Sequence, residues 1–205
     1  MMQHDDKESK LQRVARSVYC TWTPDDPSVR QLAAMSGLHY HYVWRRFPDQ
    51  EQARRKTLEG WIKELALSGP AIPPSGPSLH ARITALARSM AGFFASDDYR
   101  LMLYLVVRDA ARYPWLRHDY GRHIVAPMRG LIDALVNDYG ERLGRYTALR
   151  KGAADSFFAE LESVFALRAL RPMAIGTALD NEAVIQRCVN DLVAAVDILD
   201  LSHAA

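Results

Sequence analysis

The stretch VRQLAAMSGLHYHYVWRRF, residues 29–47, decides the fold of this chain. Ser28 precedes it and is a good N-cap residue, so we expect a helix over 29–35. Gly37 ends that helix, because glycine adopts a positive φ at little cost in such a turn. A second short helix follows over 39–47. The spacing therefore predicts two short helices that cross through a tight turn.

The side chains of these two helices divide into a packing face and a polar face. Ala33 is small where its helix must approach another, and three apolar residues suit the packed side: Leu32, Leu38 and Val43. The second helix offers polar, aromatic and cationic side chains on its other side: His39, Tyr40, His41, Tyr42, Arg45 and Arg46. A helix fits the major groove of DNA, where such side chains contact base edges and phosphates. The pattern indicates a helix-turn-helix that binds DNA.

The helical period dominates the rest of the chain as well. One apolar stripe predicts a first helix, which ends before Pro24: Leu11, Val14, Ala15, Val18, Tyr19 and Trp22. Further helices are expected over 49–67, 79–95, 99–113, 116–139, 151–171 and 181–201. Pro127 should kink or divide one of them. The sequence shows no sustained alternation with β-branched residues, so we predict no sheet and an all-α fold.

Four prolines and two glycines fall between residues 68 and 78 and cannot continue a helix. We interpret this segment as a linker at a domain boundary. The chain is thereby divided into a helix-turn-helix domain of three main helices over 1–67, a linker over 68–78 and a second, helical domain over 79–205.

The composition is that of an ordinary globular protein, with 49% apolar and 24% charged residues. The sequence contains no uncharged apolar run of the roughly 20 residues that a membrane span needs, and its polar start is no secretory signal. Cys20 and Cys188 are expected to be reduced, partly buried thiols in the cytoplasm. The formal net charge of +2 permits DNA binding without indicating it.

From residue 11 to about residue 61 the chain resembles the N-terminal domain of the TetR family of transcriptional regulators. The resemblance runs without gaps through the turn at Gly37 and the recognition helix to Phe-Pro-Asp-Gln-Glu at 47–51. The family's recognition helix usually closes with an aromatic residue, two polar or basic residues and Phe, as Trp-Arg-Arg-Phe does at 44–47. The stretch 98–116, with the long helix after it, is similar to the family's ligand-binding domain. The chain departs from the family pattern at Thr23, Pro27, Tyr40, His41 and Trp44.

The resemblance implies a cytoplasmic, homodimeric repressor that binds double-stranded operator DNA and responds to a small-molecule effector. Each of two recognition helices would enter a major groove of a near-palindromic operator. The residues expected on phosphates are Ser28, Tyr42, Trp44 and Arg46, and those expected on bases are His39, Tyr40, His41 and Arg45. The dimer would form through the last two predicted helices, so the domain over 79–205 would serve dimerisation and ligand binding.

The effector pocket is expected in the second domain, where aromatic and Met residues gather around Pro127. The candidate residues are Phe93, Met102, Tyr104, Arg108, Trp115, Tyr120, His123 and Met128. For each of them plain core packing is the alternative. Arg108 could instead pair with Asp109 or Asp133, or extend to solvent.

Other interpretations stay open. Residues 29–47 could be an ordinary helical pair, with Trp44 and one of Tyr40 and Tyr42 in its core. The adjacent Arg54, Arg55 and Lys56 are either phosphate contacts or a solvated helix face. The last two helices could bury both apolar faces within a monomer.

A regulator without an effector and a helical-bundle enzyme are the rival functions. The sequence shows no nucleophile with its base, no Gly-rich phosphate loop and no paired-carboxylate motif, so we predict no enzymatic activity. The pairs His39–His41 and His118–His123 are poorly spaced for one face of a helix. We therefore expect no metal and no cofactor.

Overall fold

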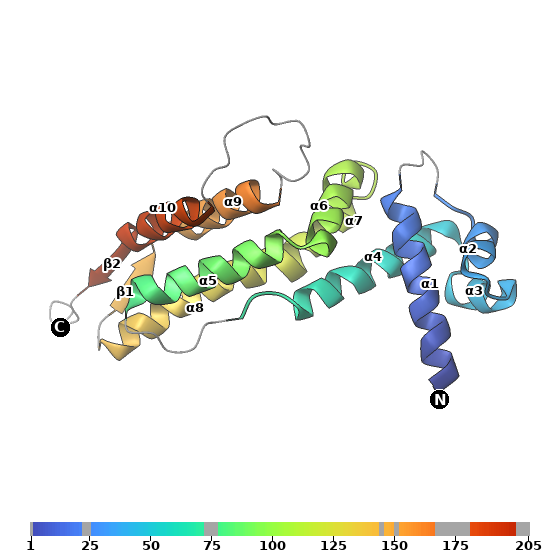
Figure 1. Cartoon of the computed structure of the whole chain (residues 1–205), viewed down its shortest axis with the longest axis horizontal. Coiled ribbons are helices and arrows are strands. Elements are labelled where there is room, and N and C mark those ends of the chain that lie inside the picture. Colours follow the sequence, from blue (N-terminus) through green and yellow to red (C-terminus); the bar gives the residue numbers. More distant parts are fainter. Residues whose placement is uncertain are drawn as a thin grey trace. The chain divides into compact units, whose positions relative to one another are not determined.

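The computed structural model describes residues 2–21, 26–71, 78–143, 146–149, 152–166 and 181–199 (Figure 1). The chain forms two compact units: unit 1 comprises Met1–Glu64 and Leu105–Tyr120, and unit 2 comprises Leu65–Tyr104 and Gly121–Ala205. Residues 105–120 thus group with the first 64 residues, although the sequence assigns them to the second domain. The predicted domain boundaries at 68–78 stay a prediction. No helix among the described residues is long and apolar enough to cross a membrane.

Unit 1 contains the predicted helix-turn-helix. Its elements are α1 (Met2–Cys20), α2 (Val29–Ser36), α3 (Tyr40–Arg46), most of α4 (Gln50–Leu67), the end of α6 (Asp97–Asp109) and α7 (Pro114–Tyr120). The helices predicted over 29–35, 39–47 and 49–67 are confirmed to within a residue at each end. Trp22 and Pro24, which the sequence places at the end of the first helix, lie outside the described residues.

The core of unit 1 ties α1, α2 and α3 together. Its buried members are Leu11, Ala15, Tyr19, Val29, Leu32, Ala33, Val43, Phe47 and Ala53, with Leu38 and Tyr42 packed against them. Leu32 and Val43 are fully buried, as the packing face predicts. Each such side chain contributes about 1.5–3 kcal/mol relative to leaving it in water. The short helices α2 and α3 therefore owe their stability to this core more than to their length.

Unit 2 is a helical bundle. It contains α5 (Leu79–Phe94), the start of α6, α8 (Ala126–Arg142), α9 (Ala153–Phe165) and α10 (Asn181–Ala194), and α5, α9 and α10 all pack on one another. An aromatic cluster lies in its core and comprises Phe93, Phe94, Tyr99 and Phe158, with ring centroids 4.9 to 6.1 Å apart. Ion pairs at the surface join Arg88 to Glu182 and Arg187 to Glu160.

The helix predicted over 116–139 is divided, as Pro127 leads us to expect. After α7 a π-helical turn, Gly121–Val125, leads into α8, where Pro127 lies at the first positions of the helix. Proline lacks the backbone N–H that would continue the hydrogen-bond ladder, so the turn before it widens.

The prediction of no sheet is wrong in one detail, although the chain is overwhelmingly helical. Strands β1 (Tyr146–Leu149) and β2 (Val196–Leu199) pair antiparallel in a two-stranded sheet, with Tyr146 opposite Leu199. The last helix consequently ends at Ala194 and does not reach residue 201. Four residues are too few to show strand alternation, and their apolar residues continue the preceding helical period.

Candidate nucleic-acid interface

Both ends of α2 are held by local hydrogen bonds. At its start the backbone N–H of Gln31 donates to Ser28 Oγ (3.2 Å), and the backbone N–H of Ser28 donates to Gln31 Oε1 (2.8 Å). This is a capping box. At its end Gly37 has φ 63°, and the N–H of Leu38 donates to the carbonyl of Ala33 (3.1 Å). The left-handed backbone conformation of Gly37 directs the chain from α2 into α3.

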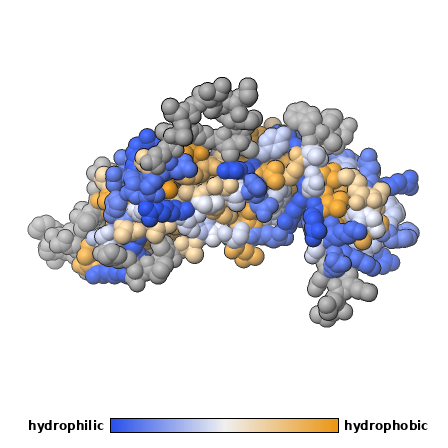
Figure 2. All heavy atoms as spheres, in the orientation of Figure 1, coloured by the Kyte–Doolittle hydropathy of each residue, from blue (hydrophilic) through white to orange (hydrophobic). Residues whose placement is uncertain are grey.

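The side chains of α3 separate into a packed side and an exposed side. Val43 is fully buried and Tyr42 is half-buried against the core of unit 1. The exposed side chains are Tyr40 (41%), Trp44 (46%), His41, Arg45 and Arg46, with His39 just before the helix. Core packing of Tyr40 and Trp44 is thereby excluded. Figure 2 shows hydrophilic residues along the outer edge of unit 1, at the right of the view.

His39 begins α3 rather than lying within it. It is the N-cap residue, and its Nδ1 accepts a hydrogen bond from the backbone N–H of His41 (3.3 Å). The two imidazole rings are stacked with centroids 5.5 Å apart. Together with Tyr40, 5.8 Å from His41 between ring centroids, they form a continuous aromatic edge at the start of the helix.

The two arginines at the end of α3 differ in their surroundings. Arg46 Nε and Nη2 each lie 2.9 Å from Glu8 Oε1 on α1. Within the described residues no carboxylate pairs with Arg45. The amine of Lys56 on α4 donates to the backbone carbonyl of Arg46 (3.0 Å) and so holds the end of α3 against α4.

Tyr42 lies beside the same carboxylate. Burial and the negative charge of Glu8 raise the pKa of the Tyr42 hydroxyl, while Arg46 opposes the shift. The hydroxyl therefore stays protonated at neutral pH and remains a hydrogen-bond donor.

Arg54 on α4 is neither a phosphate contact nor part of a solvated face. Its side chain is only 6% exposed and pairs with Asp26 and with Asp109 of α6, where Nη1 lies 2.6 Å from Asp109 Oδ2. Its guanidinium lies over the rings of Tyr19 and Tyr113, 4.8 and 4.7 Å from their centroids. All of these residues belong to unit 1. The following Arg55 is exposed and pairs with Glu59 (2.6 Å).

Asp109 has two cationic partners. Arg108 Nε donates to its Oδ1 (2.6 Å), which confirms one of the pairings expected for Arg108. Burial acts to raise the pKa of Asp109, but the hydrogen bonds from Arg108 and Arg54 outweigh it and lower the pKa below its usual range. The Tyr113 hydroxyl donates to Asp26 Oδ2 (2.7 Å) and completes the cluster. A charged network thus connects α4 to the end of α6.

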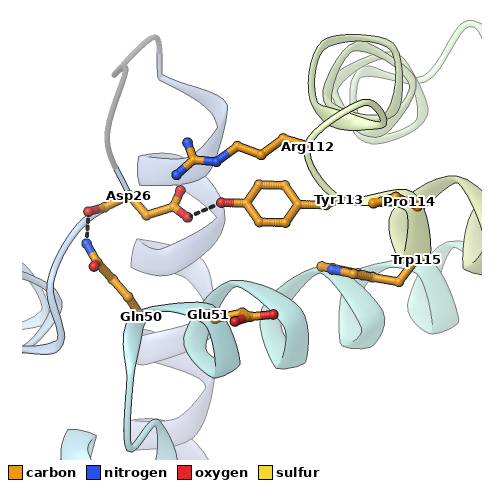
Figure 3. Close-up of a pocket in the computed structure, with 7 residues that line it drawn as sticks. All are labelled: Asp26, Gln50, Glu51, Arg112, Tyr113, Pro114 and Trp115. Carbon is orange, nitrogen blue, oxygen red and sulfur yellow. Dashed lines mark hydrogen bonds between the residues drawn. The ribbon is translucent and has the colours of Figure 1, made fainter.

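A cavity of about 700 Å³ lies beside this network in unit 1 (Figure 3). Its lining residues are Asp26, Gln50, Glu51, Arg112, Tyr113, Pro114 and Trp115. In Figure 3 the Tyr113 ring lies between the Arg112 guanidinium and the Trp115 ring, and Glu51 faces them from α4. The volume is within the range of small-molecule pockets. Of the predicted ligand-binding residues, Trp115 lines this cavity.

The other predicted ligand-binding residues are dispersed. Phe93 packs in the aromatic cluster of unit 2, Met102, Tyr120 and Met128 are buried, and Tyr104, Arg108 and His123 are half-buried. Arg108 is committed to Asp109 and to the backbone carbonyl of Tyr19 (3.0 Å). Ligand binding by these residues stays a prediction.

The sequence did not reveal Glu8, Asp26 or Tyr113 as members of these clusters, and for Asp109 it suggested only the pairing with Arg108. Each acts through a partner at least 28 residues away along the chain, except that Asp109 also pairs with its neighbour Arg108. Helical periodicity reports only which face of a helix is apolar, so it carries no signal for such pairs.

Comparisons with known proteins identify the fold of this chain. No family model matches the sequence, and no curated protein matches it. Solved structures do match. The Flavonoid-responsive Regulator FrrA is 15% identical, with a TM-score of 0.69 over 94% of this chain and 98% of that chain. A TetR family transcriptional regulator from Pseudomonas syringae is also 15% identical, with a TM-score of 0.65 over 96% and 99% of the two chains.

The chain has the TetR fold. The fatty acid degradation regulator FadR from Bacillus halodurans matches as well, at 14% identity and a TM-score of 0.61 over 91% of this chain and 94% of that chain. The predicted all-α class and the resemblance of fold are confirmed. Within the TetR fold, α2, the turn at Gly37 and α3 form the helix-turn-helix of this chain. The individual DNA contacts stay predictions.

Proposed function

We propose that this chain is a DNA-binding transcriptional regulator of the TetR type. The observation that carries the proposal is the exposed side of α3, where Tyr40, Trp44 and Arg45 stand over a core that joins α1, α2 and α3. A bundle helix has no need of such a surface, whereas a recognition helix does. Solved structures of the same fold carry the names of transcriptional regulators.

The roles of the α3 residues follow from their positions. His39, Tyr40, His41 and Arg45 would contact base edges, and Tyr42, Trp44 and Arg46 would contact phosphates. The hydroxyl of Ser28 already donates to Gln31 Oε1 (2.9 Å), so Ser28 would have to exchange that bond for a phosphate oxygen. Two subunits would present two α3 helices to a near-palindromic operator in the cytoplasm.

The test is binding to the DNA upstream of the chain's own gene, measured by fluorescence anisotropy at several salt concentrations. Replacing Arg45 and Arg46 together by Ala should weaken binding by about 100-fold, because each lost contact costs about 1–3 kcal/mol. The salt dependence should also become shallower, since fewer phosphates are neutralised.

The matched control is the double variant Arg117→Ala plus Arg122→Ala. It removes the same charge from two exposed arginines outside the helix-turn-helix. We expect it to change the affinity by less than about threefold, through long-range electrostatics alone. Equal affinities of the two double variants for the DNA would contradict the assigned interface.

The finer form of the proposal is a repressor that a small molecule releases from DNA. The cavity beside Trp115 supports it, and one protein of the same fold is flavonoid-responsive by name. Another is named a regulator of fatty acid degradation, so flavonoids and fatty acids are the first compounds to add to the protein–DNA complex. Release of DNA by one of them supports sensing, and the absence of release and of any thermal stabilisation favours a regulator without an effector.

A further inference from the structure

The carboxylate of Glu8 on α1 lies beside the residues of α3 that the proposed function assigns to DNA phosphates. Two nitrogens of the Arg46 guanidinium reach its Oε1 at 2.9 Å, and Gln12 Nε2 reaches the same oxygen at 3.3 Å. The charge of Glu8 also acts on Tyr42. Tyr42 and Arg46 thus both lie beside the carboxylate of Glu8. They are two of the three side chains of α3 that we expect to contact DNA phosphates.

A carboxylate and a phosphate make the same demands of arginine. Both accept charge-assisted hydrogen bonds from the fork of the guanidinium, so the two compete for one set of donors. The ion pair is open to that competition, because the side chains of Arg46 and Glu8 are 56% and 27% exposed. The neighbouring Arg45 has no such carboxylate among the described residues.

We propose that Glu8 is an internal competitor of DNA, whose carboxylate a backbone phosphate must displace from Arg46 for the complex to form. The inference rests on the proposed DNA-binding function. Displacement leaves Glu8 as an unpaired negative charge near the DNA, which weakens binding and retains a counterion that would otherwise be released. Glu8 thereby lowers the affinity for every DNA sequence, because phosphates carry no sequence information.

The test compares Glu8→Gln with wild type by anisotropy on the upstream DNA fragment and on a scrambled fragment of equal length. We expect binding about fivefold tighter on both fragments, since an exposed ion pair is worth at most a factor of that order. The slope of log K against log salt should steepen by about one unit, for the one extra counterion released. The folded state should be little changed, with a Tm within about 5 °C of wild type.

The matched control is Asp6→Asn, which removes one negative charge from the same end of α1. Asp6 is exposed, and no described residue forms an ion pair with it. We expect its effect on DNA affinity to stay below about twofold, through long-range electrostatics. A second arm places Glu8→Gln in an Arg46→Met background, where it should have no more effect than Asp6→Asn, because there is no guanidinium to release.

Each outcome decides the inference. The inference is wrong if Glu8→Gln binds DNA with the same affinity as Asp6→Asn. It is also wrong if Glu8→Gln binds DNA more weakly than wild type, because Glu8 would then position Arg46 for DNA. An undiminished gain in the Arg46→Met background would overturn it too. Wild-type protein that binds neither fragment overturns the proposed function itself, whereas wild-type binding with an inert Glu8→Gln overturns only the competition.

Discussion

Arg54 shows how the role of one residue depends on partners far along the chain. In the sequence it is the first of three adjacent cations, which we interpret from the sequence alone either as a solvated helix face or as phosphate contacts. In unit 1 it is buried between two tyrosine rings and two carboxylates, Asp26 and Asp109. A buried arginine keeps its charge only where such partners replace water. Its neighbours Arg55 and Lys56 remain exposed.

Replacing Arg54 by Met should destabilise the protein by about 3–5 kcal/mol, because two carboxylates would be left in unit 1 without their shared cation. Urea unfolding followed by circular dichroism measures the change. The control is Arg55→Met, which breaks an exposed ion pair with Glu59 and removes an exposed guanidinium from over the Trp115 ring, and should cost about 1 kcal/mol or less. Equal costs for the two variants would show that the Arg54 cluster contributes no more than a surface pair.

The same variant should have a characteristic pH dependence. The pKa of Asp109 is lowered in the folded protein, so its contribution is present above the ordinary carboxyl pKa and is lost as the pH falls through the lowered value. The difference in stability between wild type and Arg54→Met should therefore narrow in acid. A difference that grows as the pH falls would contradict this assignment.

At the scale of elements, the turn between α2 and α3 is the feature that sets the direction of α3. Gly37 has φ 63°, and a Cβ there would meet only the amine of Lys10, at 3.5 Å. The requirement for glycine is thus conformational rather than steric. A change of this turn would alter the direction in which α3 leaves the core.

Gly37→Ala should destabilise the protein by about 1–2 kcal/mol, the cost of a left-handed conformation for a residue with a Cβ. The control is Gly92→Ala on α5, where the space is open and the helix gains from alanine by about 0.5–1 kcal/mol. Thermal unfolding should move in opposite directions for the two variants. A stabilised Gly37→Ala would be incompatible with the left-handed turn.

The elements that the sequence predicts well are those with local signals. Ser28 as a cap, Gly37 as a stop and Pro127 as an interruption each act within a few residues of themselves. The sheet of β1 and β2 could not be predicted, because 46 residues lie between the paired Leu149 and Val196 and each strand is only four residues long. Non-local pairing of that kind leaves no period in the sequence.

At the scale of the whole molecule, the dimer stays a proposal. The apolar residues of the last two helices mostly face the interior of unit 2, where six of them are buried: Phe157, Phe158, Leu161, Ile185, Val189 and Leu192. The exposed positions of α9 and α10 include the small residues Ala159, Ala183 and Ala194. Small residues let helices of two subunits approach closely, so we propose that these positions face the second subunit.

Ala159→Arg should convert the dimer to a monomer, because an arginine without a partner has no place in a close helix contact. Sedimentation velocity measures the mass, and DNA affinity should fall with it. Ala134→Arg on α8, another exposed alanine, is the control and should leave the mass unchanged. Dimers formed by both variants would place the interface elsewhere, and a monomeric wild type would remove the dimer from the proposal.

The sequence by itself determined where α2, α3 and α4 begin and end and which side of α3 is polar, because caps, turns and apolar periods act over one or two helical turns. Only the tertiary structure decided that Arg54 is buried, that Glu8 holds Arg46 and that residues 105–120 join the first unit. Those outcomes depend on which charges meet after the chain has folded. These contacts join residues that are far apart in the sequence, and no local pattern of residues encodes them.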